Sequence, residues 1–178
     1  MQKIFLIGYM GSGKTTIGKC LASEMNLQFV DLDLFMENYY RKKIGEIFKE
    51  KGEEGFRLSE KKALREVSSF ENVLISTGGG TPCFFDNMET MNKEGLTVYL
   101  KTSPERLAGR LNQNKSNRPL IRNKNTEELI SFISENLKER EVFYNQAQVI
   151  FDLEKSDPTC INQTVDDLMI CLTPYCKS

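Results

Sequence analysis

The chain has 178 residues, which is enough for one domain with a sizeable hydrophobic core. Its formal net charge of -1 argues against a general binder of nucleic acids or membrane surfaces, and it has no apolar run of about 18 residues that could span a bilayer. The first residues lack the long apolar region and cleavage site of a signal peptide, so we expect a cytoplasmic protein.

Cysteine and histidine usage narrows the chemistry further. The five cysteines form no CxxC pair and histidine is absent, which excludes a Cys/His zinc site and disfavours a disulfide framework. Reduced thiols fit a cytosolic protein. Because the commonest general base is missing, acid-base chemistry must come from carboxylates, lysine, tyrosine or water.

The first predicted strand, Ile4–Ile7, leads into the glycine-rich sequence GYMGSGKTT. This stretch matches the pattern GxxxxGK[ST] in the strand–loop–helix context that a phosphate-binding loop requires. Glycines let backbone N–H groups surround phosphate oxygens, Lys14 adds a full charge, and the Thr15 hydroxyl is a hard ligand for Mg²⁺. The residues that we expect to bind a nucleoside triphosphate here are Gly11, Ser12, Gly13, Lys14, Thr15 and Thr16.

Two carboxylates follow the second predicted strand, Leu27–Val30. In the sequence FVDLD, Asp31 and Asp33 stand at the end of the strand, and carboxylates two apart on a strand point the same way. The carboxyl ends of parallel strands face the ligand crevice, so one carboxylate can serve the metal, directly or through water. The other can accept a hydrogen bond from an incoming hydroxyl. Taken alone, the pair fits equally well a carboxylate that merely caps the next helix.

Residues 33–70 are almost wholly helix-like and longer than a simple crossover between strands needs. They include the sequence GEEGFRLSE, in which Arg57 can bind a carboxylate with two parallel hydrogen bonds. Glu60 lies three residues on, on the same helical face, where it can orient Arg57. A solvated helix with surface pairs Glu53–Arg57 and Arg57–Glu60 explains the same spacing, and this motif alone favours that simpler interpretation.

Three consecutive glycines, Gly78, Gly79 and Gly80, follow the third predicted strand, Val73–Ser76. Glycines at the carboxyl end of a strand permit the backbone to approach a ligand closely. A tight loop without any ligand would show the same sequence. The fourth predicted strand is Leu96–Leu100.

The second half of the chain adds basic residues. Residues 112–125, NQNKSNRPLIRNKN, are polar and basic without an apolar period, which favours a lid-like loop. Arg118 in this loop could close over the γ-phosphate and stabilise charge in the transition state, and Arg110 and Arg140 flank the loop in sequence. A helix-like segment, a fifth strand at Val149–Phe151 and a last helix complete the chain. Alternating strands and helices predict an α/β domain with a mainly parallel sheet.

Together these motifs resemble the shikimate kinase family from Ile4 to about Pro158. The matching pieces are GYMGSGKTTIG, FVDLD, GEEGFRLSE, TGGG, RPLI and the RxxxY segment Arg140–Tyr144. Many enzymes share the phosphate loop, but DxD together with GExxFRxxE and GGG is far more specific. The resemblance implies a P-loop kinase fold of three α/β/α layers with a five-stranded parallel sheet. It also implies a single domain over residues 1–178, with residues 33–60 as the substrate-binding subdomain.

The same resemblance implies that ATP and Mg²⁺ phosphorylate the 3-hydroxyl of shikimate in aromatic amino acid biosynthesis. By position, Asp33 meets the reacting hydroxyl and can act as its base, while two arginines bind the substrate carboxylate. The substrate-binding residues are then Asp33, Arg57, Gly78, Gly79, Gly80 and Arg140. The catalytic residues are Asp33, Lys14 and Arg118, and the Mg²⁺ residues are Thr15 and Asp31. Arg110 and the Asp157–Pro158 turn are expected near the adenine.

Other functions remain open from the residues. A related small-molecule kinase such as gluconate kinase would need the same phosphate loop, and a nucleoside monophosphate kinase would need a further base pocket. A nucleotide-binding module without chemistry would be marked by loss of Lys14, Asp33 or the lid arginine, all of which are present. The resemblance implies a monomer that binds neither nucleic acid nor membrane. Cys83, three residues past Gly80, is expected to be a buried inert thiol.

Overall fold

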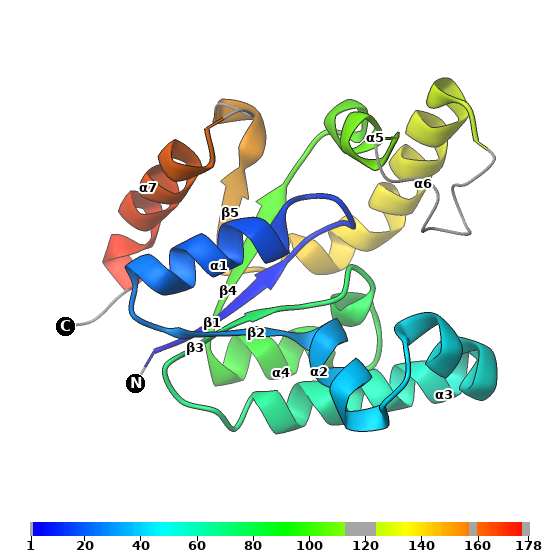
Figure 1. Cartoon of the computed structure of the whole chain (residues 1–178). Helices are drawn as coiled ribbons and strands as arrows, with labels where there is room; N and C mark the ends of the chain where they lie inside the picture. Colours follow the sequence, from blue (N-terminus) through cyan, green and yellow to red (C-terminus); the bar gives the residue numbers. More distant parts are fainter. Residues whose placement is uncertain (1, 113–123, 157–159, 176–178) are drawn as a thin grey trace.

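The structure is a computed structural model that describes residues 2–112, 124–156 and 160–175. Its centre is one five-stranded sheet in which every strand pair is parallel and the strand order is β2-β3-β1-β4-β5 (Figure 1). The strands are β1 (Lys3–Ile7), β2 (Gln28–Asp31), β3 (Val73–Ser76), β4 (Leu96–Lys101) and β5 (Val149–Asp152). All five predicted strands are confirmed, and the predicted parallel α/β class with them.

Helices cover both faces of the sheet, because successive strand residues point to opposite sides. Ile4 and Leu6 of β1 belong to the core that packs against α1 (Lys14–Glu24) and α7 (Ile161–Leu172). Phe5 and Ile7 belong to the other core, to which the remaining helices contribute. These are α2 (Leu32–Tyr40), α3 (Ile44–Val67), α4 (Asn87–Glu94), α5 (Pro104–Asn112) and α6 (Thr126–Tyr144).

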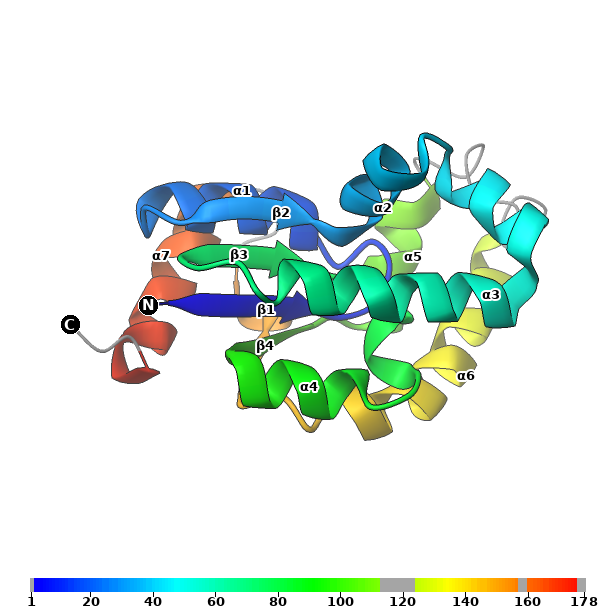
Figure 2. The same cartoon turned by 90° about the horizontal axis from the view of Figure 1, so that it is seen from below.

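The topology places a crevice at the carboxyl end of β1. This strand lies between β3 and β4, so the chain continues to one side of β1 through β2 and β3 and to the other through β4 and β5. Ligands of open α/β sheets bind where the strand order reverses in this way. Figure 2 shows the arrowheads of the strands pointing toward α2, α5 and the outer part of α3.

The surplus helical stretch after β2 consists of α2 and α3. Helix α3 is kinked at Gly52, whose φ of 66° and ψ of -178° suit only glycine. The kink separates the outer turns of α3 from the part that includes Arg57. None of the helices within residues 2–112, 124–156 and 160–175 has the length and apolar character needed to cross a membrane.

Candidate active site

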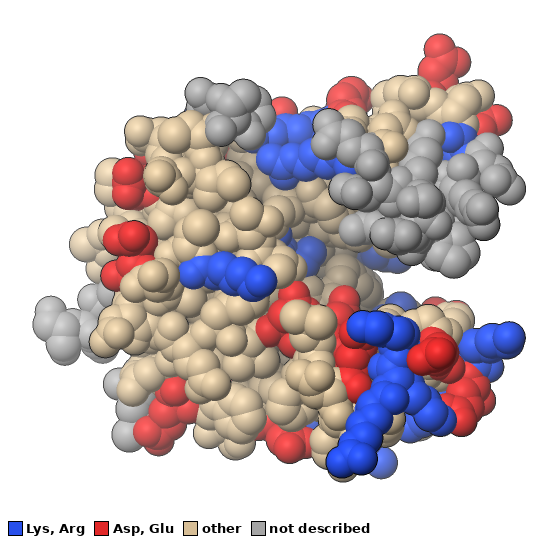
Figure 3. Space-filling model, in the orientation of Figure 1, with Lys and Arg blue, Asp and Glu red and all other residues tan. Residues whose placement is uncertain are grey.

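A cavity of about 520 Å³ opens at the carboxyl ends of the central strands. Its walls come from the phosphate loop (residues 8–16), the start of α2, the segment after β3 and one face of α5. In the space-filling view, Lys and Arg side chains gather on the α5 side of this hollow, and Asp and Glu side chains on the α2 side (Figure 3). The cavity therefore combines a cationic wall with an anionic one.

The phosphate loop has the backbone that its glycines predict. Gly8, Gly11 and Gly13 have φ of 143°, 82° and 100°, and Gly13 caps the start of α1. Lys14 Nζ donates to the carbonyl oxygens of Gly8 and Tyr9, at 2.9 Å each. The loop thus brings backbone N–H groups, the positive end of a helix and one ammonium group together, which suits a polyphosphate.

The proposed metal residues are in direct contact. Thr15 Oγ1 donates to Asp31 Oδ2 at 2.9 Å, while Asp31 Oδ1 accepts from the N–H groups of Asp33 and Leu34 and so caps α2. Capping of α2 therefore uses Asp31 Oδ1, while the proposed metal role uses Oδ2, so the two interpretations are compatible. A hydroxyl and a carboxylate oxygen are hard ligands that fit Mg²⁺. The described residues contain no cluster of three or more metal-binding acidic, Cys or His side chains.

The expected placement of Asp33 on the strand is wrong. Only Asp31 belongs to β2, and Asp33 lies in the first turn of α2. The helix nevertheless directs Asp33 into the cavity, close to Gly78. The pKa of Asp33 is raised to about 6, mainly by burial and then by the neighbouring carboxylates of Asp31 and Glu60, while Lys14 opposes the shift.

Arg57 and Glu60 form a buried ion pair rather than a solvated one. Arg57 Nη1 lies 2.8 Å from Glu60 Oε2, and the side chains are 15% and 2% exposed. Thr81 Oγ1 donates to the second oxygen, Glu60 Oε1, at 2.6 Å. The Arg57 guanidinium also lies 4.1 Å above the Phe84 ring. These contacts hold the guanidinium in one orientation, as bidentate recognition of a carboxylate requires.

The three glycines are required by close contacts. A Cβ on Gly80 would lie 2.8 Å from both terminal nitrogens of Arg57, and one on Gly78 would lie 2.9 Å from Glu60 Oε1. A Cβ on Gly79 would lie 3.1 Å from the backbone nitrogen of Met10. The glycine loop (residues 78–80) therefore contacts the carboxylates, the guanidinium and the phosphate loop at once.

Arg140 approaches the same region from α6. Its guanidinium lies 5.1 Å from the Tyr9 ring centroid. Burial raises the pKa of the half-buried Cys83 thiol to about 11, while Arg140 and Arg57 both act to lower it. Both guanidinium groups thus lie close to Cys83, which itself stays protonated. Arg57 and Arg140 are 83 positions apart in the sequence, yet both act on the same thiol.

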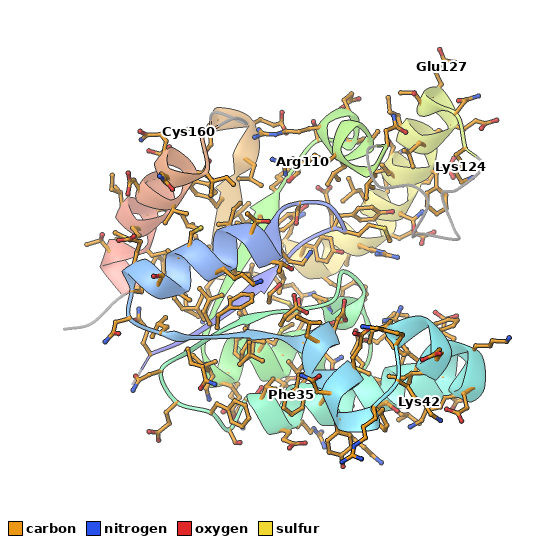
Figure 4. The ribbon with its side chains drawn as sticks, in the orientation of Figure 1. Phe35, Lys42, Arg110, Lys124, Glu127 and Cys160 are labelled. Carbon is orange, nitrogen blue, oxygen red and sulfur yellow. The ribbon has the colours of Figure 1, made fainter. Side chains whose placement is uncertain are left out.

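Helix α5 supplies the cationic wall. Arg110 reaches toward the phosphate loop (Figure 4), and its Nη1 donates to the carbonyl oxygens of Ser12 at 2.9 Å and Gly11 at 3.3 Å. Thr16 lines the cavity as expected, but Ser12 is fully buried inside the loop. Arg118, most of the predicted lid and the Asp157–Pro158 turn lie outside the described residues.

The sequence analysis did not identify several residues that line the cavity. Arg106 lines the cavity one turn before Arg110, and its Nη1 donates to the Leu153 carbonyl. Its four-residue spacing from Arg110 on a helix is the signal that could have identified it. Ile161 and Thr164 line the cavity from α7, and no motif marks them.

Comparison with known proteins places these motifs in one family. The shikimate kinase family model matches residues 10–170. A shikimate kinase of Azobacteroides pseudotrichonymphae is 53% identical over 170 residues, which cover 95% of this chain and 98% of that protein. The shikimate kinase of Parabacteroides distasonis is 55% identical over 155 residues, which cover 87% and 90% of the two chains.

Solved structures agree. Shikimate kinase from Bacteroides thetaiotaomicron matches with a TM-score of 0.90 and 48% identity, covering 96% of this chain and 98% of that one. Shikimate kinase from Acinetobacter baumannii, in complex with shikimate, matches with a TM-score of 0.84 and 31% identity, covering 99% and 96%. A gluconokinase from Sinorhizobium meliloti matches at 16% identity with a TM-score of 0.61, which is a likeness of fold alone.

Proposed function

The chain belongs to the shikimate kinase family and is an ATP-dependent phosphotransferase, and we propose that its cavity transfers the γ-phosphoryl group of ATP to the 3-hydroxyl of shikimate. The products are shikimate 3-phosphate and ADP, in the pathway to aromatic amino acids. One observation supports the assignment of this cavity above the others. A phosphate loop and a carboxylate with a raised pKa line the cavity, and the oriented guanidinium of Arg57 lies against Gly80, next to the lining residues Gly78 and Gly79.

The phosphate half of the cavity neutralises charge. Phosphoryl transfer depends on positioning and electrostatic stabilisation more than on a strong base. Lys14 and the N–H groups of the phosphate loop bind the β- and γ-phosphates. Arg110 holds the loop by its carbonyl oxygens and lies on the side where we expect the adenine, together with the Asp157–Pro158 turn. Arg118 contributes the closing cation.

The acceptor half orients the hydroxyl and the carboxylate of the substrate. Asp33 is largely ionised at neutral pH, since its pKa is about 6, and accepts a hydrogen bond from the reacting hydroxyl. A group with this pKa can also take the proton as the new O–P bond forms. Arg57 and Arg140 bind the carboxylate, and Gly78, Gly79 and Gly80 let the ring approach the backbone.

Mg²⁺ suits this site, with Thr15 and Asp31 as its protein ligands. The ion supplies charge neutralisation for the phosphates when it is bound. Thr15 Oγ1 donates to Asp31 Oδ2 at 2.9 Å, so the two side chains lie side by side next to the phosphate loop. We propose further that the protein acts as a cytoplasmic monomer, which is the default for the family.

Release of ADP from ATP and Mg²⁺ tests the function directly. It is measured with shikimate, with gluconate and without an acceptor. Strong stimulation by shikimate alone is the expected result. Stimulation by gluconate instead would keep the phosphate half and reassign the acceptor half. No stimulation by either, with ATP still bound, would contradict the catalytic function.

A further inference from the structure

Tyr144 connects α6 to the glycine loop. Its side chain is fully buried, and its hydroxyl donates to the Gly79 carbonyl oxygen. Its ring lies beside the Tyr99 ring, with centroids 5.0 Å apart at 40°. The hydroxyl therefore fixes the last turn of α6 against the middle residue of the loop.

Gly79 itself packs against other parts of the site. A Cβ on Gly79 would lie 3.1 Å from the nitrogen of Met10 and 3.5 Å from the oxygen of Gly8, so the residue packs against the phosphate loop. Its neighbours Gly78 and Gly80 pack against Asp33 and Arg57. A shift of the Gly79 carbonyl would thus move the backbone beside every group proposed for the acceptor.

Arg140 lies one helical turn before Tyr144, on the same face of α6. Burial raises the pKa of the Tyr144 hydroxyl, and the positive charge of Arg140 acts in the opposite direction. Burial dominates, so the hydroxyl stays protonated at neutral pH and keeps its donor for Gly79. The hydroxyl therefore joins the last turn of α6, one turn after Arg140, to the carbonyl of the glycine loop.

We propose that Tyr144 is a positioning residue for the acceptor pocket, whose hydroxyl holds the end of α6, and with it Arg140 one turn earlier, in place against the glycine loop. This role rests on the proposed function of the cavity. It assigns a task to the second residue of the RxxxY segment: Arg140 binds, and Tyr144 sets where it binds. Because the hydroxyl reaches the acceptor side of the site, its loss changes acceptor binding more than ATP binding.

The variant Tyr144→Phe tests this with the loss of a single oxygen atom, since the ring and its stacking remain. We expect the KM for shikimate to rise about tenfold, as for the loss of one buried hydrogen bond that positions the pocket, and the KM for ATP to change less than about twofold. Tyr99→Phe is the matched control. It removes the hydroxyl of the stacked neighbour, which donates to Glu141 Oε1 at 3.3 Å, and should leave both KM values unchanged.

A double variant separates positioning from general stability. If Tyr144 acts through Arg140, Tyr144→Phe adds little to the shikimate KM of Arg140→Ala. An unchanged shikimate KM in Tyr144→Phe, an equal rise in Tyr99→Phe, or independent effects in the double variant would each overturn the proposal. The unaltered protein is assayed alongside. Absence of shikimate-dependent ADP release there would overturn the proposed function instead.

Discussion

The two halves of the cavity are built in opposite ways. The phosphate half is one continuous segment, residues 8–16, whose glycine conformations and helix start shape it locally. The acceptor half is assembled from α2 and the glycine loop, which line the cavity, and from α3 and α6, which carry Arg57 and Arg140 beside it. A local segment can bind phosphate wherever the sheet places it. The acceptor half works only when four elements pack in register.

The halves also differ in charge balance. The phosphate half presents Lys14 and Arg110 to an anion. The acceptor half places Asp33 near the buried Glu60, whose charge helps to raise the pKa of Asp33, and Arg57 pairs with Glu60. Substitutions in the acceptor half should therefore alter chemistry, acceptor binding, pH response and stability separately, while ATP binding stays intact.

The largest expected effect comes from Asp33→Asn. The amide cannot take a proton from the acceptor hydroxyl, so kcat should fall about thousandfold, within the range for loss of a general base. The dissociation constant for ATP, measured by calorimetry, should change little. Glu37→Gln is the control, because this carboxylate on the same helix pairs with Lys43 instead. Unchanged turnover in Asp33→Asn would remove Asp33 from the mechanism.

Arg57→Ala should act next most strongly, and on the acceptor alone. Loss of a bidentate contact predicts a rise in the KM for shikimate of about a hundredfold. It also leaves Glu60 buried without its cation, which predicts a loss of about 3 kcal/mol in urea unfolding. Arg65→Ala, on the same helix but in an exposed pair with Asp86, should do neither. A change confined to the KM for ATP would contradict the assignment of Arg57.

The pH dependence should reveal the raised pKa of Asp33. As pH falls through about 6, Asp33 becomes protonated and loses its ability to accept the hydroxyl proton. Shikimate-dependent kcat/KM should then drop about tenfold for each further pH unit. The residual rate of Asp33→Asn should lack this acidic limb. An identical limb in that variant would assign the titration to another group.

The smallest expected effect is on the free energy of unfolding, which the ionised Asp33 carboxylate should lower. The pKa rises from 3.8 to about 6 on folding, so between these values the folded chain binds more protons than the unfolded chain. Stability due to this group is therefore greatest at low pH and falls as pH rises through 6. Asp33→Asn should raise the free energy of unfolding at pH 7.5 by about 2 kcal/mol, and less at pH 5.

The control variant Glu37→Gln should change the free energy of unfolding in the opposite direction. Lys43 lowers the pKa of Glu37 by a hydrogen bond, so the Glu37 carboxylate stabilises the fold at neutral pH. Glu37→Gln should therefore lose a little stability at pH 7.5 in the same urea titrations. If Asp33→Asn behaved like Glu37→Gln, the buried carboxylate would not be under strain.

The sequence by itself determined the strands, the phosphate loop and the family. Apolar runs, glycine spacing and helix starts are local features, so residues close together in the chain are enough to reveal them. The sequence pattern placed Asp33 on the wrong element, since the start of α2 depends on Asp31 capping Asp33 and Leu34. The motif around Arg57, taken alone, favoured a solvated pair, and nothing in the sequence assigned Tyr144 a task. Only the tertiary structure decided these points, because burial of Glu60, the position of Thr81 and the contact of Tyr144 with Gly79 arise between elements distant in the chain.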